Sequence, residues 1–191
     1  MDIKIAIGSG ISILIFLYAV VLFNSLITLK NNVKKGWANI DVLLKQRNTE
    51  LPKLVTTCKQ YMQYEHSVLQ EITELRQLTI EARNNNDIQS LGMAEGKLRG
   101  ALNQLFAVAE DYPDLKANEA FLHLQTRISS LENAIADRRE LYNEYVTLNN
   151  TRIEQFPDLV IGKLFRFKHF TPLEFTEDEI KSVNLNQLFK E

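Results

Sequence analysis

The sequence predicts an all-α fold, in which an N-terminal transmembrane helix precedes an elongated up-and-down antiparallel helical bundle of four segments. Three observations lead to this prediction. Ile5 through Leu29 are 25 residues without a formal charge. After them, apolar residues recur at alternating intervals of three and four, which is typical of one helix face. No segment alternates polar and apolar residues as a half-buried strand does.

The apolar run is long enough to be a membrane anchor. A helix of this length measures about 37 Å, whereas the hydrocarbon core of a bilayer is about 30 Å thick. Asp2 stands where a signal peptide has basic residues, and no convincing cleavage site follows, so we expect an uncleaved anchor. Lys30, Lys34 and Lys35 follow the run, whereas Lys4 alone precedes it. This asymmetry predicts an outside N-terminus and a cytoplasmic domain.

Small residues lie at helical spacing in the anchor, and they are Ala6, Gly8, Gly10 and Ser12. Such residues allow close contact between membrane helices. Self-association through this face is therefore one expectation, although small residues are common in any span.

Composition excludes several classes of function. The 22 basic and 24 acidic residues nearly cancel, so we expect no nucleic-acid partner. Cys58 is the lone cysteine, and the three histidines do not have metal-ligand spacing. The sequence contains no phosphate-binding glycine loop, nucleophile elbow or metal-binding helix motif. We therefore predict no catalytic residues, no cofactor and no metal, and we interpret Cys58 as a small buried apolar residue.

The first helix of the bundle continues from the anchor, and its end is the main ambiguity. Thr49 is a suitable N-cap, and Pro52 would then fall in the first turn of a new helix. This pattern favours a turn at Thr49–Pro52. In the alternative, Pro52 only kinks a helix that runs on to Arg83, which leaves three long helices.

The remaining helices have clearer limits. The second is expected to stop at Asn84–Asn86, the third to span about 87–110, and the last to reach about Gln155, before Phe156–Pro157. We therefore divide the chain into an anchor (1–29), a helical bundle with coiled-coil-like packing (30–156), and a basic-aromatic segment with an irregular tail (157–191). A capping box, Thr176 with Glu179, predicts a short helical turn in that tail.

Many residues in this order resemble the LemA family of bacterial membrane-anchored helical proteins. They include Trp37, Ile40, Asp41, Leu44, Arg47, Leu51–Pro52, Tyr61, Glu65, the stretch Tyr112–Asn118, Phe121, Arg139, Tyr142–Asn143, Asn150 and Phe156–Pro157. The sequence departs from the family pattern at Thr49–Glu50, Lys53 and Asn149. The resemblance implies a single-pass protein of the inner (cell) membrane with a helical bundle. It implies no established catalytic activity.

One polar stripe stands out on the last helix. Glu132, Arg139, Asn143 and Asn150 are separated by seven, four and seven residues, so they share a helix face. Near a core such groups need partners, and an orphaned group costs about 1–3 kcal/mol. We expect a structural polar network that fixes helix register; a recognition groove is the alternative.

The segment 159–170 interleaves aromatic and aliphatic residues with basic ones, among them Lys163, Phe165, Arg166, Phe167 and Lys168. This composition suits the boundary between lipid tails and headgroups. Membrane lipid is therefore one expected partner, and the alternative is that the aromatics pad the end of the bundle.

These observations predict a scaffold or adaptor that binds a membrane-protein partner at the inner membrane. Two alternatives remain. The first is a membrane-organising or envelope-stress factor that acts through lipid contact of 159–170, and the second is an accessory subunit of a membrane enzyme.

Overall fold

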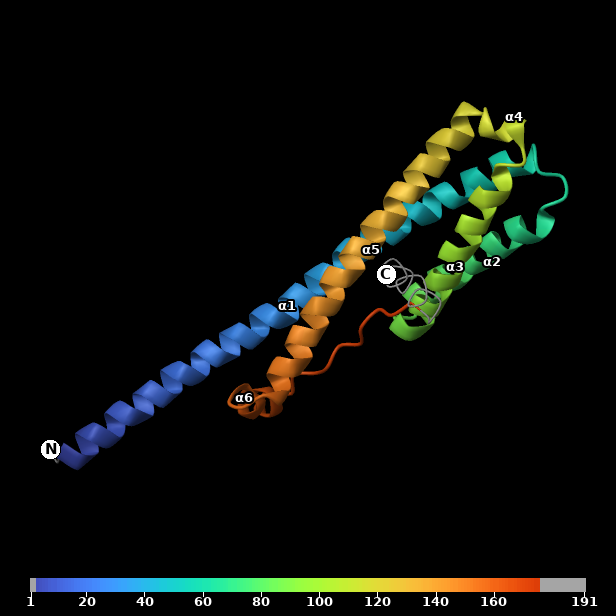
Figure 1. Cartoon of the computed structure of the whole chain (residues 1–191). Coiled ribbons are helices and arrows are strands. Elements are labelled where there is room, and N and C mark those ends of the chain that lie inside the picture. Colours follow the sequence, from blue (N-terminus) through green and yellow to red (C-terminus); the bar gives the residue numbers. More distant parts are fainter. Residues whose placement is uncertain (1–2, 176–191) are drawn as a thin grey trace, which may run out of the picture. The chain divides into compact units, whose positions relative to one another are not determined.

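The computed structural model describes residues 3–175, with side chains from residue 7 (Figure 1). The described residues form six helices and no strand, which confirms the all-α prediction. The helices are α1 (Ile3–Lys59), α2 (His66–Asn84), α3 (Ile88–Ala109), α4 (Pro113–Lys116), α5 (Glu119–Glu154) and α6 (Asp158–Leu164). The predicted capping box at Thr176 and Glu179 lies outside the described residues, as do Asp2 and the side chain of Lys4.

The chain divides into two compact units. Unit 1 comprises Met1–Ala38 and Leu141–Pro172, and unit 2 comprises Asn39–Glu140 and Leu173–Glu191. The long helices α1 and α5 each contribute residues to both units. The segments 1–29, 30–156 and 157–191 remain a prediction about organisation.

The predicted turn at Thr49–Pro52 is wrong, because α1 continues through Pro52 to Lys59. The hydroxyl of Thr49 does not cap a new helix; it donates to the carbonyl of Lys45 within the same helix, at 3.0 Å. The alternative helix to Arg83 is also wrong, since the chain leaves α1 after Lys59 and begins α2 at His66.

A tertiary hydrogen bond explains how α1 accommodates its proline. Pro52 has no N–H, so the carbonyl of Asn48, four residues earlier, loses its helical donor. Arg76 of α2 donates its Nε–H to this carbonyl at 2.9 Å. The acceptor freed by the proline is therefore satisfied by a neighbouring helix.

The actual reversal after α1 is tied to the start of α5. Asn118 donates its side-chain amide to the Tyr61 hydroxyl at 2.9 Å. The side-chain oxygen of Asn118 also accepts from the backbone N–H of Phe121 at 3.0 Å, in the manner of an N-cap. One residue of the Tyr112–Asn118 stretch thus fixes both the turn and the helix start.

Unit 2 contains a large apolar core. In Figure 1, α2 and α3 lie side by side and run in opposite directions. The core combines Leu51 and Leu54 of α1 with residues of α2, α3 and α5, including Ile72, Leu98 and Ile128.

Unit 1 packs α1 antiparallel to α5. Leu26 of α1 clusters with Ile153 of α5 and Ile161 of α6, whereas the Trp37 ring meets the Tyr142 ring at 5.6 Å. Gly36 faces α5, where an added Cβ would lie 3.3 Å from the Tyr145 ring and 3.4 Å from the Tyr142 Cα. The glycine therefore permits close approach of the two helices.

Candidate functional site

Unit 1 contains a helix segment with an exposed apolar surface. α1 is the one helix among the described residues that is long and apolar enough to cross a membrane. Every described side chain from residue 7 to 18 is exposed. Phe16 and Leu14, for example, are 67% and 68% exposed. A surface of this kind is unfavourable in water and is suited to lipid.

An aromatic cluster lies where this exposed stretch ends. The ring of Phe23 in α1 is 4.7 Å from the ring of Phe165 and 6.1 Å from the ring of Phe167. Ala19, Leu22 and Leu29 of α1 pack, like Phe23 and Phe167, against the buried cluster of Leu26, Ile153 and Ile161. The structure thus brings two predicted interface residues against the end of the apolar stretch.

The predicted basic residues lie around this cluster. Lys163 is in the last turn of α6, and Arg166 and Lys168 follow it; all three are exposed. Phe167 is half-buried, and the Lys30 ammonium lies 5.8 Å from the centre of its ring. This distance suits a cation–π interaction.

Hydrogen bonds from α5 hold the segment after α6. Asn150 bonds both backbone groups of Phe170: its Oδ1 accepts from the N–H at 3.0 Å, and its Nδ2 donates to the carbonyl at 2.9 Å. The Tyr142 hydroxyl donates to the Thr171 carbonyl at 2.9 Å. Asn150 therefore positions the loop that follows α6.

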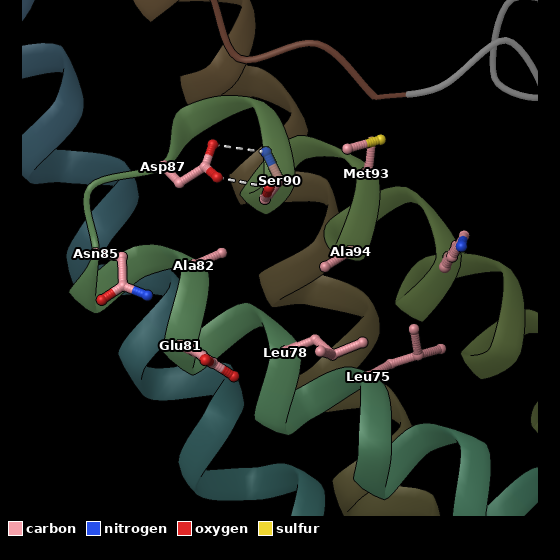
Figure 2. A pocket seen from close by; sticks show the side chains of 10 residues that line it. Leu75, Leu78, Glu81, Ala82, Asn85, Asp87, Ser90, Met93 and Ala94 are labelled. Carbon is pink, nitrogen blue, oxygen red and sulfur yellow. Dashed lines mark hydrogen bonds between the residues drawn. The ribbon is translucent and has the colours of Figure 1, made fainter.

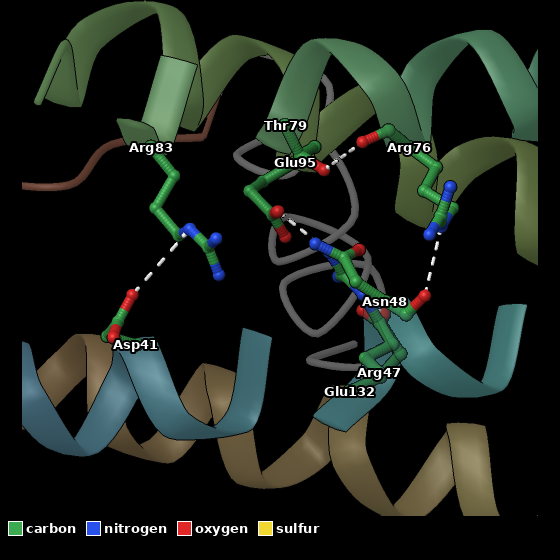
Figure 3. A network of polar contacts seen from close by, with 8 residues as sticks. All are labelled: Asp41, Arg47, Asn48, Arg76, Thr79, Arg83, Glu95 and Glu132. Atoms are coloured by element: carbon green, nitrogen blue, oxygen red, sulfur yellow. Dashed lines mark hydrogen bonds and ion pairs between the residues drawn. The ribbon is translucent and has the colours of Figure 1, made fainter. Parts of the chain in front are cut away.

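Unit 2 contains a buried ionic triad (Figure 3). Arg47 of α1 donates to Glu95 of α3 at 2.7 Å and to Glu132 of α5 at 2.8 Å. The exposed side-chain fractions are 0% for Arg47, 1% for Glu95 and 13% for Glu132. One guanidinium thus links three helices.

The electrostatics of the triad are unbalanced, because two carboxylates share one cation. Burial raises the pKa of Glu95, and the charge of Arg47 only partly opposes that effect. For Arg47, burial would lower the pKa, but the charges of Glu95 and Glu132 raise it. The pKa is therefore raised for both Arg47 and Glu95, by the two carboxylates in the first case and by burial in the second.

The helical spacing of the stripe predicts Glu132 as a site residue, whereas it does not predict Arg47 or Glu95. A signal was present, because Arg47 lies between the buried Leu44 and Leu51 at core spacing. Charged residues at such positions must meet partners. Which helices supply them depends on the tertiary fold.

The other two members of the stripe have different surroundings. Arg139 is half-buried, and its guanidinium carbon lies 3.7 Å from the centre of the Phe175 ring. Asn143 is half-buried on α5. That the four stripe residues act together remains a prediction.

A groove lies between α2 and α3 in unit 2 (Figure 2). Its volume is about 430 Å³. Its apolar side chains include Leu78 and Met93, which are 52% and 42% exposed. Glu81 and Asp87 also line it, and Lys97 provides a cation. Asp87 caps α3, and hydrogen bonds from the Ser90 hydroxyl and backbone lower its pKa.

Cys58 is fully buried in the core of unit 2, as expected of a small apolar residue. Burial raises the pKa of its thiol to about 12. Among residues 3–175, no group of three or more His, Cys, Asp or Glu side chains is placed to hold a metal ion.

The fold and the exposed apolar stretch define a membrane-associated, all-helical protein. The LemA family model matches residues 36–186, and the chain belongs to the LemA family. It is 30% identical to Protein LemA of Metamycoplasma hominis over 170 residues, which cover 86% of this chain and 74% of the relative.

Two further relatives are magnetosome proteins. The chain is 25% identical to Magnetosome protein MamQ 2 of Paramagnetospirillum magneticum, over 84% of this chain and 68% of the relative. It is 23% identical to Magnetosome protein MamQ of Magnetospirillum gryphiswaldense, over 76% of this chain and 62% of the relative.

Proposed function

We propose that this protein is a membrane-anchored helical scaffold that binds a protein partner and performs no catalysis. The observation that carries the proposal is the continuity of α1. One helix supplies the exposed apolar stretch from residue 7 and also the buried residues Ile40, Leu44 and Leu51 of unit 2. The apolar stretch and part of the core of unit 2 therefore belong to one helix.

The α2–α3 groove is the surface that we propose for the partner. Its occupant is an amphipathic helix, because exposed Leu78 and Met93 provide apolar contacts and charged side chains line the same groove. Glu81 on the rim favours a basic residue on that helix, and Lys97 favours an acidic one. Charge complementarity would thus orient the partner.

Site-specific photo-crosslinking tests this proposal in cells that produce the full chain. A photoreactive residue at Leu78 or Met93 is expected to give one discrete adduct with a protein partner. Gln77 is the matched control, because it is exposed on α2 and does not line the groove. Adducts of equal yield at Gln77 and Leu78, or none at Leu78 and Met93, would contradict groove binding.

A second candidate function is membrane organisation through lipid contact of 159–170. Residues 3–18 make about 24 Å of helix, which is shorter than a hydrocarbon core of about 30 Å. A span that begins at residue 3 therefore includes positions 19–22. Ala19 and Leu22 pack against the same buried cluster as Phe167, so the basic-aromatic segment would meet the headgroups.

A fluorophore at Phe165 tests lipid contact in reconstituted full-length protein. Phe165 is 53% exposed, so a label there is accessible to a quencher. We expect quenching by headgroup-level quenchers. A label at Tyr64, which is 86% exposed in unit 2, provides the reference for an unquenched site. Equal quenching at the two positions would contradict specific contact of the segment.

We also propose the topology that the lysine asymmetry favours, with the N-terminus outside and the helical units cytoplasmic in the inner membrane. A cysteine introduced at Glu191 should react with a membrane-impermeant thiol probe only after permeabilisation. Cys58 need not be removed, because it is fully buried and its pKa is raised to about 12. Labelling in intact cells would reverse the assignment.

A further inference from the structure

We propose that unit 1 carries a binding site for the phosphate-rich headgroup of an acidic phospholipid. The site is a pocket of about 340 Å³ between α1 and the loop that follows α6. Its lining residues are Lys30, Lys34, Arg166, Phe167, Lys168, His169 and Phe170. The inference rests on the proposed lipid contact and assigns it to one pocket and one class of lipid.

The side chains that line the pocket are mostly basic. Four lining side chains are lysine or arginine, and no carboxylate lines the pocket. The carboxylate of Glu154 lies 2.7 Å from His169, so its negative charge is directed to the histidine. Four cations without a lining carboxylate favour a ligand with more than one negative charge. A phosphate monoester or a lipid with two phosphodiesters, such as cardiolipin, has this charge.

Arg166 has a backbone conformation that favours glycine. The N–H of Phe167 donates to the carbonyl of Gly162, and the N–H of Arg166 donates to that of Lys163. These two bonds form a Schellman motif at the end of α6, in which Arg166 occupies the left-handed position with φ 54°. Glycine is favoured there, so an arginine adds a cation to the pocket at a cost in backbone energy.

The apolar surroundings identify a lipid rather than a soluble anion. The rings of Phe167 and Phe170 line the same pocket as the cations. Leu164 and Phe165, immediately before Arg166 in the chain, are 71% and 53% exposed. A ligand that joins a phosphate to acyl chains satisfies both surfaces, whereas inorganic phosphate satisfies only the cations.

Native mass spectrometry of the full-length chain in detergent micelles tests the site. The probes are cardiolipin, phosphatidylglycerol at twice the molar concentration to match charge, and inorganic phosphate. We expect cardiolipin to bind most tightly. Lys34→Gln should weaken its binding about fivefold, which corresponds to about 1 kcal/mol for one basic residue near a lipid surface.

Lys35→Gln is the matched control. Lys35 is exposed on the same helix and next to Lys34, but it does not line the pocket. It should bind cardiolipin as the unmodified chain does. Arg166→Gly keeps the fold testable, because glycine suits the left-handed position, and we expect it to lose affinity without losing stability.

The outcomes separate this inference from the lipid-contact function. Equal weakening by Lys34→Gln and Lys35→Gln would overturn the pocket, because diffuse attraction would then suffice, while quenching at Phe165 would still support lipid contact. Inorganic phosphate that displaces cardiolipin at equal concentration would overturn the lipid assignment. Absence of quenching at Phe165 would overturn the lipid-contact function itself.

Discussion

A charged triad is buried and paired in unit 2, whereas a group of basic side chains is exposed in unit 1. Unit 2 encloses Arg47 in its core, and two carboxylates from α3 and α5 bind it. Unit 1 keeps Lys34, Arg166 and Lys168 exposed beside aromatic rings, and no carboxylate lines their pocket.

This difference separates structural charges from charges available to a ligand. A buried pair fixes which helices meet, because removing one partner leaves an uncompensated charge. An exposed cation contributes little to folding but remains free to attract an anion. The following predictions test whether the two units respond to mutation as this contrast requires.

The largest effect is expected for Arg47→Met in unit 2. The substitution leaves Glu95 and Glu132 without their cation, so the free energy of unfolding should fall by about 3–5 kcal/mol. Denaturant unfolding of the detergent-solubilised chain, followed by circular dichroism, measures the change. Lys45→Met should lose at most about 1 kcal/mol, because Lys45 is 58% exposed in its pair with Asp41. Similar losses for both variants would contradict a structural triad.

Phe23→Ala should produce the largest effect in unit 1. It removes ring contacts with Phe165 and Phe167, which should destabilise the docking of α6 by about 1–2 kcal/mol. Faster hydrogen exchange in residues 165–170 reports the change. Phe16→Ala should leave exchange there unaltered, since Phe16 is 67% exposed. If both variants behave alike, the aromatic cluster does not hold the segment.

Arg139→Leu should have a smaller effect. Its guanidinium stacks on Phe175, so loss of this cation–π contact is expected to cost about 0.5–1 kcal/mol. A double-mutant cycle with Phe175→Leu measures the coupling. Additive losses in the double variant would show that the stack contributes nothing to stability.

Glu95→Gln should have the smallest effect near neutral pH and a clear effect on pH dependence. The pKa of Glu95 is raised from 4.5, so its contribution to stability is fully present below that value and is lost as pH rises toward the folded-state pKa. The variant removes this decline, because its amide does not titrate, and its oxygen can still accept from Arg47. Unfolding curves collected over a pH series that starts below 4.5 and rises above it measure the slope. An unchanged slope would assign the pH dependence to other groups.

Much of the fold could be predicted from apolar spacing and helix breakers. Thr49 and Pro52 predicted a turn wrongly, because capping and proline patterns describe only the local chain. In the structure the helix continues, and Arg76 of α2 supplies the donor that the Asn48 carbonyl loses to Pro52. The sequence of α1 alone cannot predict that bond, because its donor lies on α2.

The sequence predicted which residues belong to the basic-aromatic segment, but it did not predict which residues they contact. The spacing of residues 159–170 identified the aromatic and basic side chains, but their contact with Phe23 depends on how the chain reverses. Glu132 was found because it lies on a periodic face, whereas its partner Arg47 comes from a helix 85 residues earlier in sequence. Long-range pairing of this kind is determined by tertiary packing.

The bond between Arg76 and the Asn48 carbonyl also has a genetic consequence. Pro52→Ala would return an N–H to α1, and that N–H would compete for the same carbonyl. The arginine is therefore required only while the proline is present. A substitution that removes Arg76 would have Pro52→Ala as its second-site suppressor, so the two positions should change together when the helix pair diverges.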